Sequence, residues 1–167
     1  FLTETYLSLR RLENEALNYI YNGQIVLGFD DLIKVSIGQF YGIEINDFAV
    51  TVAKTALWIA ESQMMKETEE IVKINLEFLP LRSYANIVEG NALTLDWESL
   101  VPKDKLNYIM GNPPFVGGMM AKKEQKEDML SVIGNIKGLG ELDYVGAWYY
   151  KARKYIVGKH IEVGFVW

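Results

Sequence analysis

The residues with the clearest chemical potential form the tetrapeptide Asn112-Pro113-Pro114-Phe115, directly after the apolar stretch 106–110. Neither proline has an N–H to donate, and each restricts the residue before it to extended conformations, so a strand that enters this sequence must end in a stiff loop. There the amide oxygen of Asn112 and the carbonyl of Pro113 can accept hydrogen bonds from an exocyclic amino group, while Phe115 stacks on the ring that carries it. The tetrapeptide predicts a site for a flipped nucleobase, although a Pro-Pro pair is more often an ordinary turn.

Composition limits the class of protein. With 167 residues, half of them hydrophobic, the chain can bury one sizeable core and is expected to form one domain. It contains no cysteine, which excludes disulfides and thiolate metal sites. No signal peptide is evident and no apolar run approaches the ~20 residues that span a bilayer, so the sequence predicts a soluble cytoplasmic protein without membrane contact.

The formal net charge of −5 bears on possible partners. Affinity for DNA depends largely on Lys and Arg side chains that neutralise phosphates. If DNA is the substrate, regions outside this chain must therefore hold it.

Helical and strand patterns alternate along the chain, which predicts a mostly parallel sheet covered by helices. The expected strands and helices are listed here in order: helix 3–20, strand 39–45, helix 48–66, strand 86–89, strand 105–110, helix 142–156 and strand 161–166. Asn46 and Asp47 provide N-cap chemistry for the second helix. The charged stretch 122–128 is expected to be a solvated loop or an exposed helix face because its charges alternate in sign.

The first helix is predicted to be amphipathic, with its charged residues, Arg10 among them, largely on the outer side. The inward residues expected from the helical spacing are Tyr6, Leu9, Leu12, Ala16 and Leu17.

Polar groups follow three of the predicted strands, and ligands of such sheets lie outside the carboxyl ends of the strands. Glu44 can accept both hydroxyls of a ribose, or it can be an acid that the dipole of the next helix favours. Asn91 can bind an adenine edge, or it can belong to an ordinary Gly-Asn turn. The loop of Asn112 is the third, so the three strand ends together favour a nucleoside-containing cofactor.

Other conspicuous side chains are better explained by structure. His160 precedes the last strand and is expected to be structural. Trp148, Tyr149 and Tyr150 are expected to pack in the core. Asp143 is either the N-terminal acid of its helix or part of an active-site wall.

Four segments in this order resemble the methyltransferase core of single-chain type II restriction-modification enzymes, whose S-adenosylmethionine-dependent module makes N6-methyladenine. The segments are 42–45, 89–93, 111–115 and 142–150. The resemblance covers essentially the whole chain and implies a Rossmann-like methyltransferase fold, a mostly parallel sheet with flanking helices.

The resemblance also implies roles for individual residues. Glu44 would bind the ribose of S-adenosylmethionine and Ile45 would pack on its adenine. Asn91 stands where many relatives carry an aspartate that contacts the cofactor. Asn112, expected in both sites, would form the target-base site together with Pro113, Pro114 and Phe115.

The chain departs from the family pattern at both ends. The glycine-rich cofactor loop that opens such enzymes would precede Phe1, and the target-recognition region would follow Trp167, so residues 1–167 are expected to be a partial catalytic domain. No nuclease motif lies within them. A sheet without its central strand exposes unpaired backbone groups, which predicts self-association of the fragment.

The expected mechanism needs no metal and no covalent intermediate, because hydrogen bonds from the amino group to Asn112 and Pro113 would aim its lone pair at the sulfonium methyl. Asparagine at position 112 favours adenine N6 over cytosine N4. Two alternatives stay open: a protein glutamine N-methyltransferase, whose amide substrate poses the same chemical problem, and a methyltransferase-like scaffold without catalysis.

Overall fold

The computed structural model describes residues 1–21, 32–73 and 85–166. The chain divides into two compact units, Phe1–Glu89 and Gly90–Trp167, which we call the first and the second unit. Each is described by itself.

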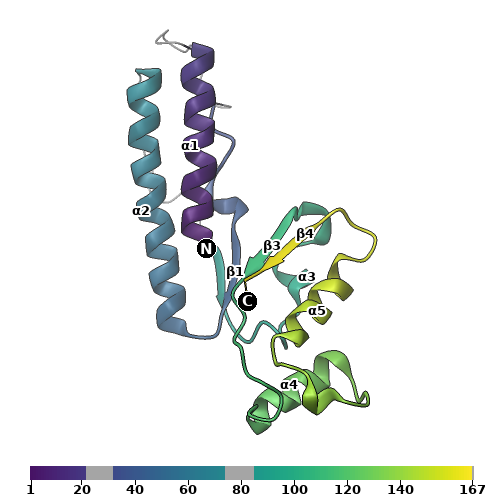
Figure 1. Ribbon diagram of the computed structural model, residues 1–167. Coiled ribbons are helices and arrows are strands. Elements are labelled where there is room, and N and C mark those ends of the chain that lie inside the picture. Colours follow the sequence, from purple (N-terminus) through teal and green to yellow (C-terminus); the bar gives the residue numbers. More distant parts are fainter. Residues whose placement is uncertain (22–31, 74–84, 167) are drawn as a thin grey trace. The chain divides into compact units, whose positions relative to one another are not determined.

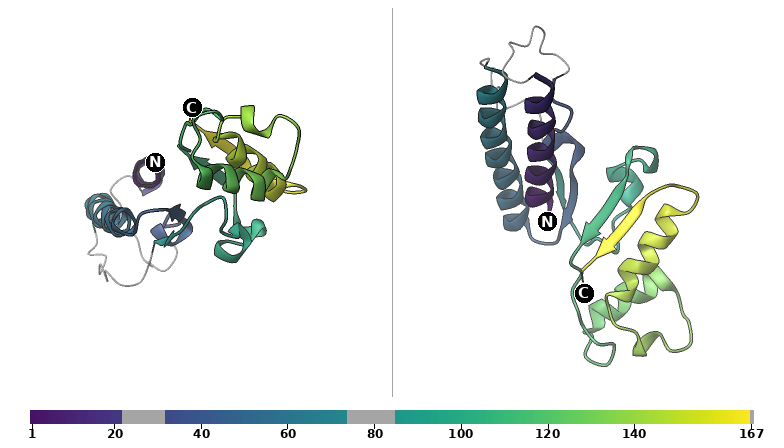
Figure 2. Two further views of the ribbon diagram at one scale, coloured as in Figure 1. Left: turned by 90° about the horizontal axis from the view of Figure 1, so that it is seen from below. Right: turned by 45° about the horizontal axis from the view of Figure 1, so that its top comes forward.

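The first unit joins a pair of parallel strands to two long helices. Strand β1 pairs in parallel with β2, and Glu44 lies opposite Glu89 at the carboxyl end of the pair. The helices α1 and α2 lie side by side and run in the same direction (Figures 1 and 2). The elements of this unit are α1 (Leu2–Tyr21), a 3-10 turn η1 (Ile37–Gln39), β1 (Tyr41–Glu44), α2 (Asp47–Val72) and β2 (Asn86–Glu89).

The expected cap of α2 is confirmed, because the side chain of Asn46 accepts a hydrogen bond from the backbone N–H of Ala49 at 3.0 Å. Asp47 follows in the first turn, where the helix dipole favours a negative charge. Helix α2 runs six residues beyond the predicted end at 66 and stops where Lys73 adopts a left-handed conformation, with φ 55°.

The buried face of α1 differs from the prediction. Tyr6 and Leu17 are buried as expected, whereas Leu9, Leu12 and Ala16 are exposed. Arg10, which the charge pattern placed outside, is 0% exposed. Its guanidinium forms an ion pair with Glu13 and donates to the Thr68 hydroxyl at 2.7 Å.

The apolar core of the first unit lies between the helices and the strands. Tyr6 meets Phe40 edge to face, with ring centroids 5.6 Å apart. The buried members of this core are Tyr6, Ile37, Phe40, Val50, Leu57, Ala60, Met64, Ala85 and Ile87.

The second unit contains another parallel pair, in which β3 and β4 align from Tyr108 opposite Glu162 to Gly111 opposite Phe165. Its core contains Leu93, Met129, Ile133, Tyr144 and Ala147. The elements of this unit are α3 (Trp97–Leu100), η2 (Lys103–Lys105), β3 (Tyr108–Gly111), α4 (Lys123–Ile133), η3 (Leu139–Glu141), α5 (Gly146–Ile156) and β4 (Glu162–Phe165).

The parallel pairing predicted from the alternating pattern is confirmed, and the chain is a mixed α/β protein with short parallel strands. Strand 86–89 matches its predicted bounds, whereas β1 and β3 begin later because 3-10 turns occupy 37–39 and 103–105. Helix α5 starts at Gly146 rather than 142, since the residues before it form η3 and a turn.

The charged stretch 122–128 forms the N-cap and the first part of helix α4, whose inner face buries Met129 and Ile133. Within residues 1–21, 32–73 and 85–166, no helix is long and apolar enough to cross a membrane.

Candidate functional site

Glu44 ends β1 in the first unit, and its carboxylate bends back over the start of the next segment. Oε1 accepts the backbone N–H of Ile45 at 2.9 Å and that of Asn46 at 3.3 Å. Oε2 accepts no hydrogen bond from the residues that the structure describes. The carboxylate is thus fixed by its own backbone and keeps one oxygen for a ligand such as a ribose hydroxyl.

Two large apolar side chains beside Glu44 are unusually exposed. Ile45 is 71% exposed and Phe48, in the first turn of α2, is 73% exposed. Exposed apolar side chains next to a polar anchor suit a ligand that has both a hydroxyl-bearing part and a flat apolar part. Ile45 was named from the sequence, but Phe48 was not. The position of Phe48, an apolar residue in the first turn of the helix that follows Glu44, could have indicated it.

The proline loop leaves the second unit's sheet directly after β3. The last residue of the strand, Gly111, still accepts a backbone hydrogen bond from Val166 at 3.0 Å. Pro113 is then buried, while Asn112, Pro114 and Phe115 are exposed. The loop is therefore anchored through one proline and presents the three residues around it.

Asn112 and Phe115 are both free to contact a substrate. The side chain of Asn112 makes no hydrogen bond to any described residue. Phe115 is 51% exposed. An unpaired amide and a half-exposed ring on a stiff loop can bind a planar group that carries an amino nitrogen.

The far end of the loop is fastened to the residues before α5. Asp143 Oδ1 accepts the N–H of Val116 at 3.3 Å and the N–H of Val145 at 3.0 Å. The N–H of Tyr144 donates to the carbonyl of Val116 at 2.9 Å. Asp143 thus both caps the turn that leads into α5 and holds the proline loop.

Asn91 lies in the second unit, and its side chain is engaged within the protein. Its Oδ1 accepts the N–H of Leu93 and its Nδ2 donates to Asp128 Oδ2, both at 2.9 Å. The hydroxyl of Tyr144 donates to the same oxygen of Asp128 at 2.6 Å. Burial, and then this bond to Asp128, raise the pKa of Tyr144 above its ordinary value, which keeps the hydroxyl protonated.

Asp128 was not singled out in the sequence, because the stretch 122–128 has alternating charges. Its position on α4 could have indicated that it faces inward, because it lies one residue before the buried Met129 and on the same face as Val132.

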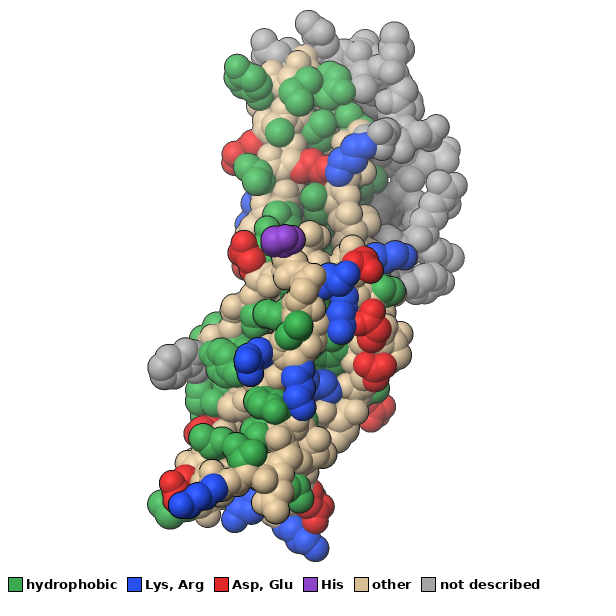
Figure 3. Space-filling view, turned by 90° about the vertical axis from the view of Figure 1, so that its right-hand side faces the viewer, with side chains coloured by type: hydrophobic (Ala, Val, Ile, Leu, Met, Phe, Trp, Pro, Cys, Tyr) green, Lys and Arg blue, Asp and Glu red, His purple; other side chains and the backbone are tan. Residues whose placement is uncertain are grey.

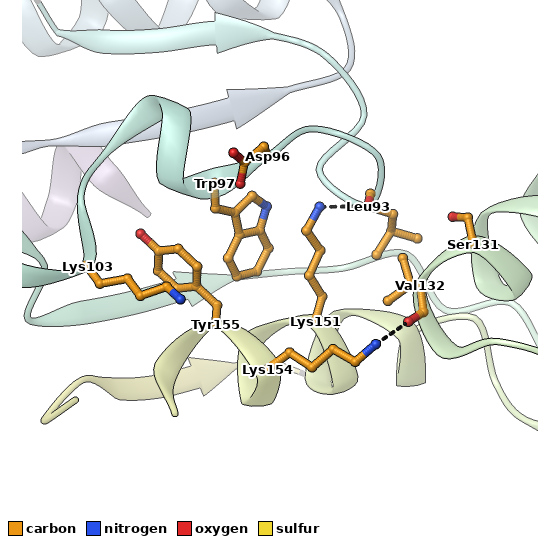
Figure 4. Close-up of a pocket in the computed structure, with 9 residues that line it drawn as sticks. All are labelled: Leu93, Asp96, Trp97, Lys103, Ser131, Val132, Lys151, Lys154 and Tyr155. Atoms are coloured by element: carbon orange, nitrogen blue, oxygen red, sulfur yellow. Dashed lines mark hydrogen bonds between the residues drawn. The ribbon is translucent and has the colours of Figure 1, made fainter. Parts of the chain in front are cut away.

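A lysine holds the loop that follows Asn91 (Figure 4). Lys151 Nζ donates to the carbonyl of Leu93 at 2.7 Å and also to that of Leu95. The ammonium lies 5.3 Å from the centre of the Trp97 ring, and burial lowers the pKa of Lys151. The sequence could have indicated that Lys151 faces inward, because it lies four residues from both Ala147 and Tyr155 on the inner face of α5.

Lys151 lines a shallow pocket in the second unit together with Lys154 and Tyr155 (Figure 4). Lys154 donates to the carbonyl of Val132 at 3.1 Å, and the Tyr155 hydroxyl donates to that of Val101 at 2.6 Å. These polar groups are therefore engaged by the protein itself.

The remaining conspicuous residues have structural surroundings. Trp148 and Tyr150 pack against the core of the second unit, as expected, whereas Tyr149 is partly exposed and meets the ring of Phe165 at 5.1 Å. His160 lies on the surface, on a face where charges of both signs are interspersed (Figure 3). Among the described residues, no group of His, Cys, Asp and Glu is arranged to hold a metal ion.

The structure brings together part of the predicted site within each unit. The first unit contains Glu44 and Ile45, and the second contains Asn91 and the loop 112–115. In the second unit, the backbone of Val116 and the side chain of Asn91 are connected through Tyr144 and Asp128.

The family described as "MmeI, DNA-methyltransferase domain" matches residues 1–167. The chain belongs to this family. The resemblance to single-chain restriction-modification methyltransferases, inferred from four short segments, is confirmed.

Two relatives show how far the similarity to this family extends. The chain is 41% identical over 170 residues to DNA methyltransferase A of Bacillus subtilis (strain 168), a match that covers 99% of this chain and 19% of the relative. The solved structure of the type IIL restriction-modification enzyme MmeI in complex with DNA matches with a TM-score of 0.90 and 41% identity, over 99% of this chain and 22% of that one. The chain spans about a fifth of the length of these relatives.

Proposed function

We propose that this chain is part of the catalytic domain of a DNA methyltransferase within a restriction-modification protein, and that it transfers a methyl group from S-adenosylmethionine to the exocyclic N6 of adenine. The observation that carries the proposal is the exposed, unpaired Asn112 amide beside the half-exposed Phe115, at the end of β3. Membership of the MmeI methyltransferase family supports it.

The first unit fits the nucleoside part of this cofactor. Glu44 Oε2 can accept a ribose hydroxyl, and the exposed Ile45 can cover one face of an adenine. We further propose that the complete domain has a Rossmann-like fold, because β1-α2-β2 is a parallel unit with its acid at the carboxyl end of a strand. Asn91 contributes through the loop that it holds, since its own amide is bound to Asp128 and to the N–H of Leu93.

The chemistry requires positioning rather than an acid or a base of shifted pKa. S-adenosylmethionine supplies an electrophilic methyl group on a sulfonium. The Asn112 side-chain oxygen and the Pro113 carbonyl accept the two N6 hydrogens, so that the nitrogen lone pair points out of the ring plane at the methyl carbon. With S-adenosylmethionine bound, transfer would form the N6–C bond and break the C–S bond, leaving that electron pair on sulfur, and N6 would release one proton to solvent.

Double-stranded DNA is the proposed partner, held through regions outside these residues because the chain has a net charge of −5. We place the reaction in the cytoplasm, where such DNA is accessible.

The test is methyl transfer by the full-length protein with labelled S-adenosylmethionine and mixed-sequence DNA, followed by identification of the product nucleoside by mass spectrometry. Asn112→Ala is expected to lower kcat by about 10²–10³-fold, the typical effect of removing one positioned hydrogen-bonding group. The matched control is Asn107→Ala, which removes an exposed asparagine at the opposite end of β3.

N6-methyladenine that disappears in Asn112→Ala and persists in Asn107→Ala supports the proposal. Label found in protein glutamine, or cofactor binding without transfer to any acceptor, contradicts it and favours respectively a glutamine methyltransferase or a scaffold.

We also propose that the isolated 167-residue chain self-associates. Among the described residues each strand pairs with a single neighbour, which leaves four strands with an unpaired edge. Size-exclusion chromatography with light scattering should show oligomers that grow with concentration, and a strict monomer contradicts this expectation.

A further inference from the structure

Two adjacent residues, Asp143 and Tyr144, lie where the polar contacts of two different loops meet. One loop is the proline loop, which continues through Val116, and the other is the loop that starts at Asn91. Neither Asp143 nor Tyr144 is exposed as a substrate-binding residue would be: Asp143 is half-buried and Tyr144 is 5% exposed. Their place in the structure therefore indicates a role that acts through other residues.

Asp143 and the backbone of Tyr144 together satisfy both backbone groups of Val116. The carboxylate of Asp143 accepts the Val116 N–H at 3.3 Å, and the Tyr144 N–H donates to the Val116 carbonyl at 2.9 Å. Val116 directly follows Phe115 in the chain. The position of the Phe115 ring thus depends directly on Asp143.

The next residues of the loop pack too closely to move independently of this anchor. Gly118 is buried, and a Cβ at that position would lie 2.3 Å from the carbonyl oxygen of Gly140 and 2.5 Å from that of Leu142. The backbone of the loop therefore lies directly on the segment that precedes Asp143.

The side chain of Tyr144 extends in the other direction, toward Asn91. Its ring packs in the core of the second unit, and its hydroxyl donates to Asp128 Oδ2, which also accepts the Asn91 amide. The other end of the Asn91 amide fixes the N–H of Leu93 at 2.9 Å. A hydroxyl on Tyr144 thus determines how Asn91 and the following turn are held.

We propose that Asp143 and Tyr144 are positioning residues with separate effects: Asp143 aligns the target-base loop for methyl transfer, and Tyr144, through Asp128, aligns the Asn91 loop for cofactor binding. This inference rests on the proposed function. It assigns the two loops to two measurable quantities, kcat for Asp143 and the cofactor Kd for Tyr144.

The kinetic test uses the full-length protein with Asp143→Ala, Asp143→Asn and Tyr144→Phe. Asp143→Ala should lower kcat at least about tenfold, because small displacements of a positioning loop have large effects on rate. Asp143→Asn retains an oxygen that can accept both N–H groups, so its kcat should stay within about threefold of wild type. Both variants should keep the wild-type Kd for S-adenosylmethionine.

Tyr144→Phe should give the complementary result. It keeps the ring in the core and removes one hydrogen bond, so the cofactor Kd should rise about fivefold while kcat at saturating cofactor changes little. The matched control is Tyr149→Phe on α5, whose hydroxyl makes a long 3.5 Å contact with Phe165 and none with Asp128. It should leave both quantities unchanged.

A readout independent of activity separates this inference from the proposed function. Hydrogen–deuterium exchange of the free protein should speed up at residues 115–118 in Asp143→Ala but not in Asp143→Asn, and at residues 92–95 in Tyr144→Phe but not in Tyr149→Phe. If the wild type fails to methylate DNA while these exchange patterns appear, the proposed function is wrong and the positioning contacts stand.

Three results overturn the inference. These are equal loss of activity in Asp143→Asn and Asp143→Ala, an effect of Tyr144→Phe on kcat with an unchanged cofactor Kd, and uniform exchange across the unit with a lowered Tm. The last of these would indicate that the two residues serve only general stability.

Discussion

In the first unit buried polar side chains lie between two helices, whereas in the second unit half-buried polar side chains join loops that carry candidate site residues. Arg10, Asn14 and Thr68 connect α1 to α2, and none of them forms a hydrogen bond with Glu44, whose carboxylate accepts the N–H groups of Ile45 and Asn46. Asp128, Asp143 and Lys151 instead bind groups within or next to the Asn91 loop and the proline loop. The same kind of interaction thus stabilises the fold in one unit and orders the site in the other.

The difference has a physical cause. Helices satisfy most of their own backbone groups, so polar side chains between two helices bind mainly one another, and the bond from the Thr68 hydroxyl to the carbonyl of Met64 at 2.8 Å stays within its own helix. Loops leave N–H and carbonyl groups unpaired, and a side chain that binds them restricts the loop as well as stabilising it. The comparison therefore predicts opposite responses to mutation in the two units.

The largest effect is expected for Arg10→Ala in the first unit. Glu13 is mostly buried, and the substitution removes the cation that pairs with it. Breaking a buried ion pair by removing one partner costs about 3–5 kcal/mol of unfolding free energy. Urea unfolding of the full-length protein, followed by circular dichroism, measures it. At a temperature where the full-length variant is still folded, kcat and the cofactor Kd should equal those of wild type.

The matched control for Arg10→Ala is its neighbour Arg11, which is exposed and pairs with Glu4 at 3.7 Å. Arg11→Ala should cost less than about 1 kcal/mol, as surface ion pairs do. Similar losses for the two variants, or a changed cofactor Kd in Arg10→Ala, would contradict the division between the units.

An intermediate effect is expected for Lys151→Met in the second unit. Methionine preserves the apolar stem and removes the donor, which leaves the carbonyls of Leu93 and Leu95 unpaired at a cost of about 1–3 kcal/mol. Because these carbonyls belong to the Asn91 loop, the cofactor Kd of the full-length protein should rise as well, as isothermal titration calorimetry can measure.

Lys154→Met is the control for Lys151→Met, since Lys154 lies on the same helix and donates to Val132 rather than to the Asn91 loop. It should change the cofactor Kd little. A stability loss in Lys151→Met without any change in cofactor affinity would show that the second unit behaves like the first.

Local sequence patterns predicted the strand 86–89, the N-cap at Asn46 and the exposed loop of Asn112, because each depends on a few adjacent residues. The buried face of α1 was predicted wrongly, since periodicity ranks Arg10 as polar and does not show Thr68, which is 58 residues away. The partners of Asn91 and of Val116 lie 37 and 27 residues along the chain. Such pairings are set by the tertiary fold, which explains why candidate site residues could be proposed from local sequence whereas the residues that hold them in place could not.

The smallest change in free energy is expected for Ile45→Ala. In contrast to Arg10→Ala in the same unit, it should change cofactor affinity rather than stability. Ile45 is exposed, so its loss should leave the unfolding free energy nearly unchanged. If it covers the adenine of the cofactor, truncation removes about 1 kcal/mol of apolar contact and raises the cofactor Kd about fivefold. Ile59→Ala, an equally simple truncation of an exposed isoleucine on α2, should change neither quantity. If Ile45→Ala instead lowers stability and spares cofactor affinity, the exposed end of β1 belongs to an interface with another part of the protein, and the first unit contributes only structure.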